Sequence, residues 1–363
     1  MTPKLSCPVC GALADLVYAA HWGYQAPACF DLYECSECET SFAQPMQVDP
    51  AVYELIYRNA GRVPGYDRYT RYRELLKSSP DPLRDMCAQE DVYWAIREAM
   101  RGMDAGRHKP LKILEVGSGF GYLTYALRRA GYESTGIDIS QEAVNMARRE
   151  FGDFYRVADL EVLTVSPGDG FDIVLATELI EHITDPAGFL EKAASLLNAG
   201  GALLVTTPNR DLYPKRLVWN TDPPPVHLWW FSKTSFRYFA WKLGMSVRFV
   251  DFAGFYGRDG TDPRVPSKPQ TFDAEGGICF KDSWFRTLAR SAVTRVPALF
   301  RPLAKLLLAQ LAFARLRERL FRDSLSLCVI LQPAARGGSL RSRKETAKSL
   351  VATTATSQET AAT

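Results

Sequence analysis

Four cysteines near the amino terminus occur in two pairs, and each pair encloses two residues. Cys7 pairs with Cys10 and Cys35 pairs with Cys38, and 24 residues separate the pairs. Two such pairs supply four thiolates, a common ligand set for a structural Zn²⁺ held in tetrahedral geometry. The spacing therefore predicts a structural zinc site. Cys29 lies between the pairs and could replace one ligand, and the competing interpretation is a set of ordinary free thiols.

A second group that could do chemistry combines carboxylates with an imidazole. Glu178, Glu181 and His182 stand at positions i, i+3 and i+4, so one helical turn would place them on one face. Such a set could bind a divalent cation or take part directly in catalysis. The competing interpretation is that the Glu-His pair only shapes the turn. His227 follows in a loop of prolines and aromatic residues, which suits an acceptor pocket, a general base or a packed histidine.

A third candidate site is a glycine-rich turn at residues 113–121, which joins an apolar strand to a helix. Its spacing is G-x-G-x-G, and position 122, where a dinucleotide fingerprint needs Gly or Ala, is Tyr122. Glu115 precedes the turn, where its carboxylate would repel a pyrophosphate but attract an ammonium group. Asp138 is placed to accept hydrogen bonds from ribose hydroxyls, and Asp159 to meet an adenine amino group. A ligand with ribose, adenine and positive charge but no phosphate is S-adenosylmethionine.

Strands and helices alternate from residue 111 onward, which predicts a mainly parallel α/β sheet with crossover helices. The expected strands are residues 112–116, 133–137, 154–157, 171–176, 202–206, 246–251 and 324–331. The expected helices are residues 122–130, 141–150, 186–197 and 233–243. Residues 50–105 should also be helical, and their tyrosines either pack against the sheet domain or line a pocket; these are Tyr53, Tyr57, Tyr66, Tyr69, Tyr72 and Tyr93.

On these residues, the segment 111–251 resembles a class I S-adenosylmethionine-dependent methyltransferase. The resemblance rests on Glu115 with its glycines, on Asp138, on the run from residue 171 to 183, and on the Thr-Thr-Pro-Asn of residues 206–209. It implies an α/β fold with a Rossmann-like seven-stranded sheet. It also implies a cofactor site made by Glu115, Gly117, Ser118, Gly119, Gly121, Asp138, Ile139, Ala158, Asp159 and Thr177.

Two further resemblances bear on the acceptor. The Glu-x-x-Glu-His pattern is similar to quinone-ring O-methyltransferases, where it is linked to a divalent cation; here this implies a cation at Glu178, Glu181 and His182. The cysteine pairs resemble zinc-binding leaders of bacterial enzymes such as sugar C-methyltransferases. No Asn/Asp-Pro-Pro-Tyr/Phe motif follows the fourth strand. By resemblance to known methyltransferases, its absence disfavours methylation of nucleobase amino groups.

The expected function is therefore O-methylation of a small-molecule or glycan-precursor acceptor. The alternatives are a quinone-like or lipid-linked acceptor, and C-methylation of a sugar. A macromolecular methyltransferase guided by the zinc ribbon ranks lower, and a cofactor-binding regulator without turnover ranks lowest.

Charge argues against nucleic acid as a partner. The formal net charge of the 363 residues is only +3, and residues 1–60 carry two basic against seven acidic residues. Phosphate binding needs clustered lysine and arginine. An apolar share of 47% predicts a globular chain with a sizeable core. Neither a membrane span nor a signal peptide is evident, so a cytoplasmic location is expected.

The expected organisation has four parts: a zinc ribbon at 1–48, a helical lid or linker at 49–108, the methyltransferase domain at 109–333, and a disordered tail at 334–363. A helical insertion at 254–322 precedes the last strand. Residues 295–322 are apolar and basic, so they either pack on the core or a second copy, or lie as an amphipathic helix on an anionic membrane. The oligomeric state is left open.

Overall fold

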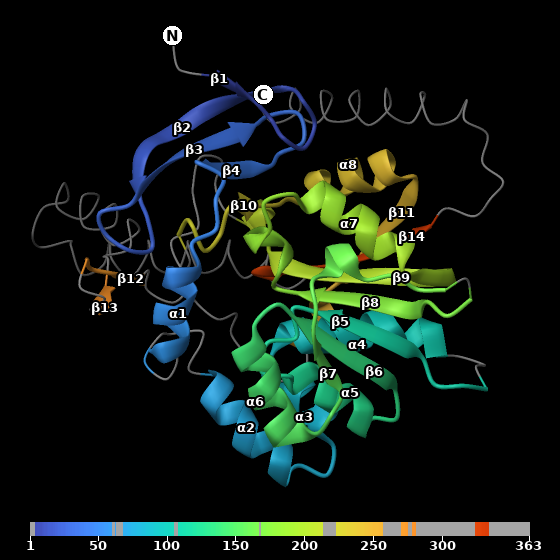
Figure 1. Ribbon diagram of the computed structural model, residues 1–363. Coiled ribbons are helices and arrows are strands. Elements are labelled where there is room, and N and C mark those ends of the chain that lie inside the picture. The colour runs from blue at the N-terminus through green and yellow to red at the C-terminus, as the bar shows by residue number, and fades with distance from the viewer. Residues whose placement is uncertain are drawn as a thin grey trace, which may run out of the picture.

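The computed structural model describes residues 4–59, 62, 68–104, 108–166, 168–212, 223–256, 270–274, 278–280 and 324–333. Within these residues the chain forms a small antiparallel sheet and a larger mixed sheet, which lie side by side in Figure 1. Four helices connect the two sheets along the chain.

The smaller sheet has five strands in the order β1-β2-β3-β4-β10. Four of them come from the amino terminus: β1 (Lys4–Ser6), β2 (Leu13–Trp22), β3 (Cys29–Cys35) and β4 (Ser41–Gln44). The fifth, β10 (Trp229–Trp230), comes from a loop of the larger domain and pairs antiparallel with β4. The cysteine-bearing sheet is thus completed by the larger domain, and we call β1–β4 the cysteine module.

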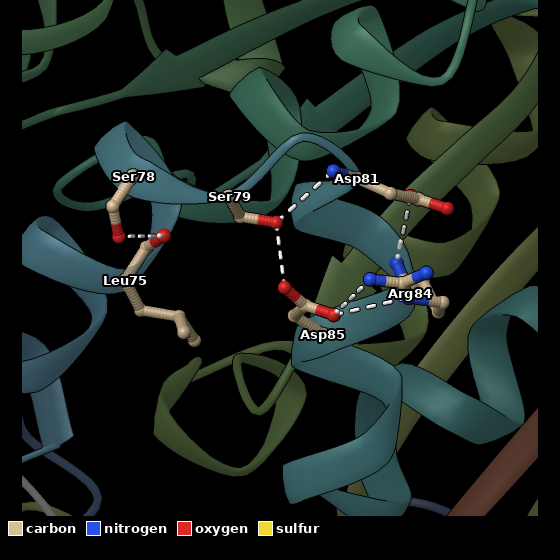
Figure 2. Close-up of polar contacts among 6 residues, drawn as sticks. All are labelled: Leu75, Ser78, Ser79, Asp81, Arg84 and Asp85. Carbon is tan, nitrogen blue, oxygen red and sulfur yellow. Dashed lines mark hydrogen bonds and ion pairs between the residues drawn. The ribbon is translucent and has the colours of Figure 1, made fainter.

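The connecting helices are α1 (Pro50–Arg58), α2 (Arg68–Ser78), α3 (Pro82–Gln89) and α4 (Asp91–Asp104). Figure 2 shows the turn between α2 and α3, where Asp81 caps α3 by accepting a hydrogen bond from the Arg84 amide at 3.1 Å. Ser79 accepts from the Asp81 amide and donates to Asp85 at 2.6 Å. Pro82 occupies the first turn of α3, where its missing amide hydrogen costs nothing. These hydrogen bonds stabilise the turn in which the chain changes direction between α2 and α3.

The larger sheet has seven strands in the order β11-β14-β9-β8-β5-β6-β7. Pairings among β5 to β9 are parallel, and β14 runs antiparallel to both neighbours. The predicted α/β fold with a seven-stranded Rossmann-like sheet is confirmed. Its strands are β5 (Lys112–Val116), β6 (Glu133–Asp138), β7 (Tyr155–Val157), β8 (Phe171–Thr177), β9 (Leu197–Pro208), β11 (Met245–Phe249) and β14 (Ser326–Pro333).

Helices cover both faces of this sheet. The group α5 (Tyr122–Arg129) and α6 (Gln141–Phe151) shares one apolar core with α2, α3 and α4. The group α7 (Pro186–Ser195) and α8 (Lys233–Leu243) lies on the other face, and its core extends into the cysteine module. Short 3₁₀ turns follow three strands: η1 (Leu160–Val162), η2 (Ile180–His182) and η3 (Arg210–Leu212).

The region predicted as a helical insertion is described only in part. It contains α9 (Ala253–Tyr256) and the paired strands β12 (Gln270–Phe272) and β13 (Ile278–Phe280). The predicted basic helix at 295–322 lies outside the described residues, as does the tail at 334–363. The division at residues 49, 109 and 334 stays a prediction. In the part of the chain that is described, no helix has both the length and the hydropathy that crossing a membrane requires.

Candidate active site and cysteine cluster

The glycine turn between β5 and α5 is shaped for close approach of a ligand. Gly121 has φ +83°, and a Cβ there would lie 2.5 Å from the ring of Tyr155. Gly119 has φ +50°, and a Cβ there would meet no atom within 4 Å. Position 121 must therefore be glycine, because a side chain there would clash with Tyr155. Position 119 faces open space, so the backbone at Gly119 is accessible to a bound molecule.

Glu115 points from β5 toward the start of α5. Its side chain is buried, at 4% exposure, and its carboxylate accepts a short hydrogen bond from the Thr124 hydroxyl. Burial raises the pKa of Glu115 to about 7, and the hydrogen bond from Thr124 opposes this only in part. A carboxyl with this pKa changes charge near neutral pH. A cation bound beside it would favour the ionised form.

Asp138 ties the glycine turn to the end of β6. One carboxylate oxygen accepts from the Gly119 amide and the other from the Ser140 amide, both at 2.8 Å. The next residue, Ile139, is 78% exposed, which is unusual for a large apolar side chain. The Ala158 amide, beyond β7, donates to the Asp138 carbonyl at 3.0 Å. The carboxyl ends of β6 and β7 thus place these residues together.

Three more predicted cofactor residues complete this edge of the sheet. Asp159 is exposed and caps η1 by accepting from the Glu161 amide at 3.0 Å. The hydroxyls of Ser118 and Thr177 are buried, and neither has a hydrogen-bond partner among the described residues. Buried polar groups normally have partners. Two orphaned hydroxyls beside an open glycine turn fit a site for a polar ligand such as S-adenosylmethionine.

The turn after β8 brings a carboxylate and two imidazoles together. The candidate ligand atoms of Glu181, His182 and His227 all lie within 4.8 Å of one another. We call these three residues the Glu-His-His cluster. Glu178 lies outside this group, because its backbone adopts φ +47° and the 3₁₀ turn begins only at Ile180. The helical face predicted for Glu178, Glu181 and His182 is therefore not the arrangement that the structure has.

Hydrogen bonds fix the orientation of His182. Its Nδ1 lies 2.7 Å from the Val226 carbonyl oxygen, which can only accept, so Nδ1 carries the hydrogen. The Tyr53 hydroxyl, from α1, donates to the same carbonyl at 3.3 Å and lies 3.1 Å from Nδ1. The other ring nitrogen, Nε2, lies 3.9 Å from a Glu181 carboxylate oxygen.

Both histidines of the cluster are neutral at neutral pH. Burial lowers the pKa of His182 to about 4, although the Val226 and Glu178 carbonyls favour its charged form. Burial lowers the pKa of His227 well below its usual value, and neighbouring His182 adds to this shift. The contact between His182 and Glu181 is therefore not an ion pair at pH 7.

The loop that carries His227 is fastened to the turn after β8. The Leu228 amide donates to the Glu181 carbonyl at 2.8 Å, and the Trp229 indole donates to the Ile183 carbonyl at 2.6 Å. Sequence reasoning missed both contacts and the role of Tyr53. The only indication of these contacts in the sequence was the density of proline and aromatic residues in the loop that carries His227. The cysteine module thus reaches the cluster through β10.

The four paired cysteines converge as predicted. The sulfurs of Cys7 and Cys38 lie 3.7 Å apart and those of Cys10 and Cys35 lie 3.4 Å apart, and all four sulfurs lie within 4.8 Å. A tetrahedron of sulfurs about 2.3 Å from Zn²⁺ has edges of about 3.8 Å, so the group fits a zinc ion. Cys29 is exposed and outside the group, so it replaces no ligand here.

Comparison with known proteins identifies relatives of the part of the chain that carries the glycine turn. Residues 89–248 match the family described as "Methyltransferase domain". The ubiquinone biosynthesis O-methyltransferase of Parvibaculum lavamentivorans is 31% identical over 173 residues, covering 46% of this chain and 64% of the relative. The enzyme of the same name from Caulobacter vibrioides is 36% identical over 131 residues, covering 33% and 52%. The chain thus spans only part of the length of these relatives.

A solved structure that matches part of this chain is that of magnesium protoporphyrin IX methyltransferase from Synechocystis PCC 6803 with S-adenosylmethionine bound. It is 19% identical, covers 54% of this chain and 88% of its own, and has a TM-score of 0.34. The sheet order, the glycine turn with its acidic neighbours and the matched relatives together identify the larger domain. Residues 89–248 are a class I S-adenosylmethionine-dependent methyltransferase domain.

Proposed function

We propose that this protein transfers a methyl group from S-adenosylmethionine to a hydroxyl oxygen of a small-molecule acceptor. The observation that carries this proposal is the position of the Glu-His-His cluster beside the glycine turn. A Cβ on Gly117 would lie 2.9 Å from the side chain of Leu179, which immediately precedes η2. Groups able to act on an acceptor hydroxyl therefore stand next to the cofactor edge of the sheet.

The cofactor would be held by the residues at the carboxyl ends of β5, β6 and β7. Glu115 suits the ammonium group, Asp138 the ribose hydroxyls and Asp159 the adenine amino group. Exposed Ile139 would cover the adenine ring, and the orphaned hydroxyls of Ser118 and Thr177 would find partners, with Ala158 beside them. When bound, the cofactor supplies an activated methyl group on a sulfonium. The chain's own task is to align the acceptor and deal with its proton.

The names of the relatives and the Glu-His-His cluster both narrow the chemical class of the methyl acceptor. The curated relatives named above are ubiquinone biosynthesis O-methyltransferases, which favours a phenolic, quinone-like acceptor over C-methylation of a sugar. Glycan precursors remain the second candidate class. A cytoplasmic location is part of this proposal, and for residues 295–322 packing on the core or on a second copy is preferred over contact with an anionic membrane.

Binding of S-adenosylmethionine should depend on pH through Glu115. Because the pKa of Glu115 is about 7, lowering the pH through 7 protonates it and removes its attraction for the ligand's ammonium group. Affinity should therefore fall below pH 7, and a proton should be released on binding. Glu115→Gln should bind about 10–100-fold more weakly, the loss of a charged hydrogen bond. It should also lose the dependence on pH.

Calorimetric titrations at pH 6, 7 and 8, each in two buffers of different ionisation enthalpy, measure both quantities. Glu133→Gln is the matched control, because Glu133 is exposed and lies at the start of β6, whereas the proposed cofactor residue Asp138 lies at its end. Unchanged affinity in Glu115→Gln would contradict this role.

The proposed reaction is tested with methyl-labelled S-adenosylmethionine and an extract lacking this methylation. Products are divided into organic, small aqueous and macromolecular fractions. Label in the organic fraction supports the quinone-like acceptor, and label in the small aqueous fraction supports a glycan precursor or similar metabolite. Label only in macromolecules, or no label above a protein-free control, contradicts the proposal.

A further inference from the structure

We propose that the methyltransferase domain completes the metal site of the cysteine module. Thr40 donates a hydrogen bond to the thiolate of Cys38, and Ser235 at the start of α8 holds Thr40 in that position. A zinc ion on the four cysteines therefore binds most tightly when the module is docked on the domain. This linkage concerns the predicted zinc ion and does not depend on which acceptor is methylated.

Three buried side chains link the cysteine cluster to α8. The Cys38 sulfur lies 3.3 Å from the Thr40 hydroxyl oxygen, which lies 2.9 Å from the Ser235 hydroxyl oxygen. The Ser235 hydroxyl also donates to the Cys38 carbonyl at 3.1 Å. Cys38, Thr40 and Ser235 are each 0% exposed, so water does not compete for these contacts. Groups 197 positions apart in the sequence thus belong to one closed ring of hydrogen bonds.

A capping box fixes the Ser235 side chain at the start of α8. The Ser232 hydroxyl accepts from the Ser235 amide at 3.0 Å, and the Ser235 hydroxyl accepts from the Ser232 amide at 3.0 Å. Capping boxes usually have Glu or Gln at the position of Ser235. A glutamate carboxylate there could accept from the Ser232 amide but could not donate to the Cys38 carbonyl. The serine hydroxyl serves the helix and the cysteine module together.

A zinc ion on the cysteines gives the Thr40 hydroxyl a specific task. Four thiolates carry more negative charge than one Zn²⁺ balances, and three of the four cysteines are buried. Hydrogen bonds donated to a buried charge stabilise it. The hydroxyl hydrogen of Thr40 can rotate, so this group accepts from a Cys38 thiol but donates to a Cys38 thiolate. Ser235, 2.9 Å away, can then donate to Thr40 in turn.

Packing and the backbone hold the two hydroxyls in register with the cluster. The Cys35 amide donates to the Thr40 carbonyl at 3.0 Å, which ties Thr40 to a second cysteine of the cluster. On the other side, Phe236 follows Ser235 directly and lies in the same buried core as three of the cysteines. Groups held by regular elements and a packed core keep their geometry when a ligand binds. The outer shell of the metal site is therefore preformed.

The linkage between zinc and docking is reciprocal. If docking on α8 tightens zinc binding by some factor, zinc tightens docking by the same factor. Loss of an outer hydrogen bond to a metal ligand typically weakens metal binding about 10–100-fold. Zinc should therefore stabilise α8, a helix of the methyltransferase domain, as well as the cysteine module. Because α8 begins directly after the loop that carries His227, this stabilisation also reaches the end of that loop.

The first test measures the affinity of the full-length protein for Zn²⁺ by competition with a chromophoric chelator. Thr40→Val and Ser235→Ala should each bind Zn²⁺ about 10–100-fold more weakly than the wild-type protein. The double variant should lose less than the product of the two single losses, because Ser235 acts largely through Thr40. Near-ultraviolet circular dichroism of each variant shows whether the fold is retained.

Two control variants separate these hydrogen bonds from helix capping. Ser232→Ala removes the N-cap of α8 but keeps the hydroxyls of Thr40 and Ser235, and Ser140→Ala removes the N-cap of α6. Both should bind Zn²⁺ within about threefold of the wild-type protein, because neither removes an outer hydrogen bond to a cysteine. An equal loss of affinity in Ser232→Ala and Ser235→Ala would assign the effect to capping and contradict the proposal.

A second measurement needs no substitution. Hydrogen exchange of the full-length wild-type protein is followed with Zn²⁺ bound and after its removal by a chelator. Amides of α8 should exchange about tenfold faster without Zn²⁺. Amides of α5 should keep their rates, because α5 belongs to the core on the opposite face of the sheet.

Three further results would overturn the proposal. The first is a wild-type protein that binds no Zn²⁺. The second is binding of Zn²⁺ by Thr40→Val or Ser235→Ala within about twofold of the wild-type affinity, less than an outer hydrogen bond contributes. The third is unchanged hydrogen exchange of α8 when Zn²⁺ is removed. All three are measured without S-adenosylmethionine or an acceptor, so they are distinct from a failure of the proposed methyl transfer.

Discussion

Replacing Cys35 by serine should unfold the cysteine module and stop methyl transfer. Structural zinc contributes about 10–16 kcal/mol to the folding of small zinc modules, and a site with three thiolates loses much of that energy. Cys7, Cys35 and Cys38 are buried in the same apolar core as Phe236 of α8. The module also holds β10, and through it the loop with His227. Disorder in the module should therefore reach the acceptor side of the active site.

The measurements for this prediction are zinc content, thermal unfolding and turnover of the full-length protein. Cys29→Ser is the matched control, because Cys29 is exposed and outside the cluster. We expect Cys35→Ser to retain far less than one zinc per chain and to melt earlier, and Cys29→Ser to match the wild-type protein. A stable, active Cys35→Ser protein without zinc would show that the ion is dispensable.

Replacing Trp229 by alanine should cost about 3–5 kcal/mol of unfolding free energy, the range for deleting a large buried side chain. Trp229 is 1% exposed, stacks on Phe231 with ring centres 5.9 Å apart, and packs against Phe42 of β4. Its indole also donates to the Ile183 carbonyl at the end of the turn that bears His182. One substitution therefore removes a packing contact between the domains and a tether of the active site.

Urea unfolding of the wild-type protein and of Trp229→Ala measures this loss of unfolding free energy. Trp241→Ala is the matched control, because Trp241 lies on α8 at 46% exposure and its loss should change stability by no more than about 0.5 kcal/mol. Trp229→Ala should also lower turnover more than cofactor affinity. Equal stability losses in the two variants would contradict the interdomain role of Trp229.

The regular part of the fold was predictable because the sequence is locally consistent. The central strands β5, β8, β9 and β14 each contain an apolar run, and helix starts carry capping residues such as Ser140, Asp185 and Ser232. The seven strands expected between residues 112 and 331 and the four helices expected between residues 122 and 243 are therefore present, with ends shifted by a few residues. In the region expected to be a helical insertion, by contrast, described residues form the strands β12 and β13. The convergence of the four cysteines was predictable too, because metal-ligand spacing is a local pattern.

Long-range contacts were not predictable in the same way. β10 has only two residues and pairs with a strand far earlier in the chain, so no periodicity marks it. Tyr53 was one of several tyrosines, and nothing in the sequence distinguished it as the partner of His182. The grouping of Glu178 with Glu181 and His182 assumed a helical turn, and the positive φ of Glu178 prevents that turn. A non-glycine residue rarely adopts this conformation, so residue type gave no warning.

We propose that the carboxyl ends of β5, β6 and β7 hold S-adenosylmethionine. The most direct measurement is a calorimetric titration of the full-length protein with S-adenosylmethionine and, separately, with NADH. We predict one site for S-adenosylmethionine, weakened about 10–100-fold by Asp138→Ala through lost hydrogen bonds to a charged group, and no binding of NADH. Binding of NADH in place of S-adenosylmethionine, or no effect of Asp138→Ala, would show that this edge of the sheet does not hold S-adenosylmethionine.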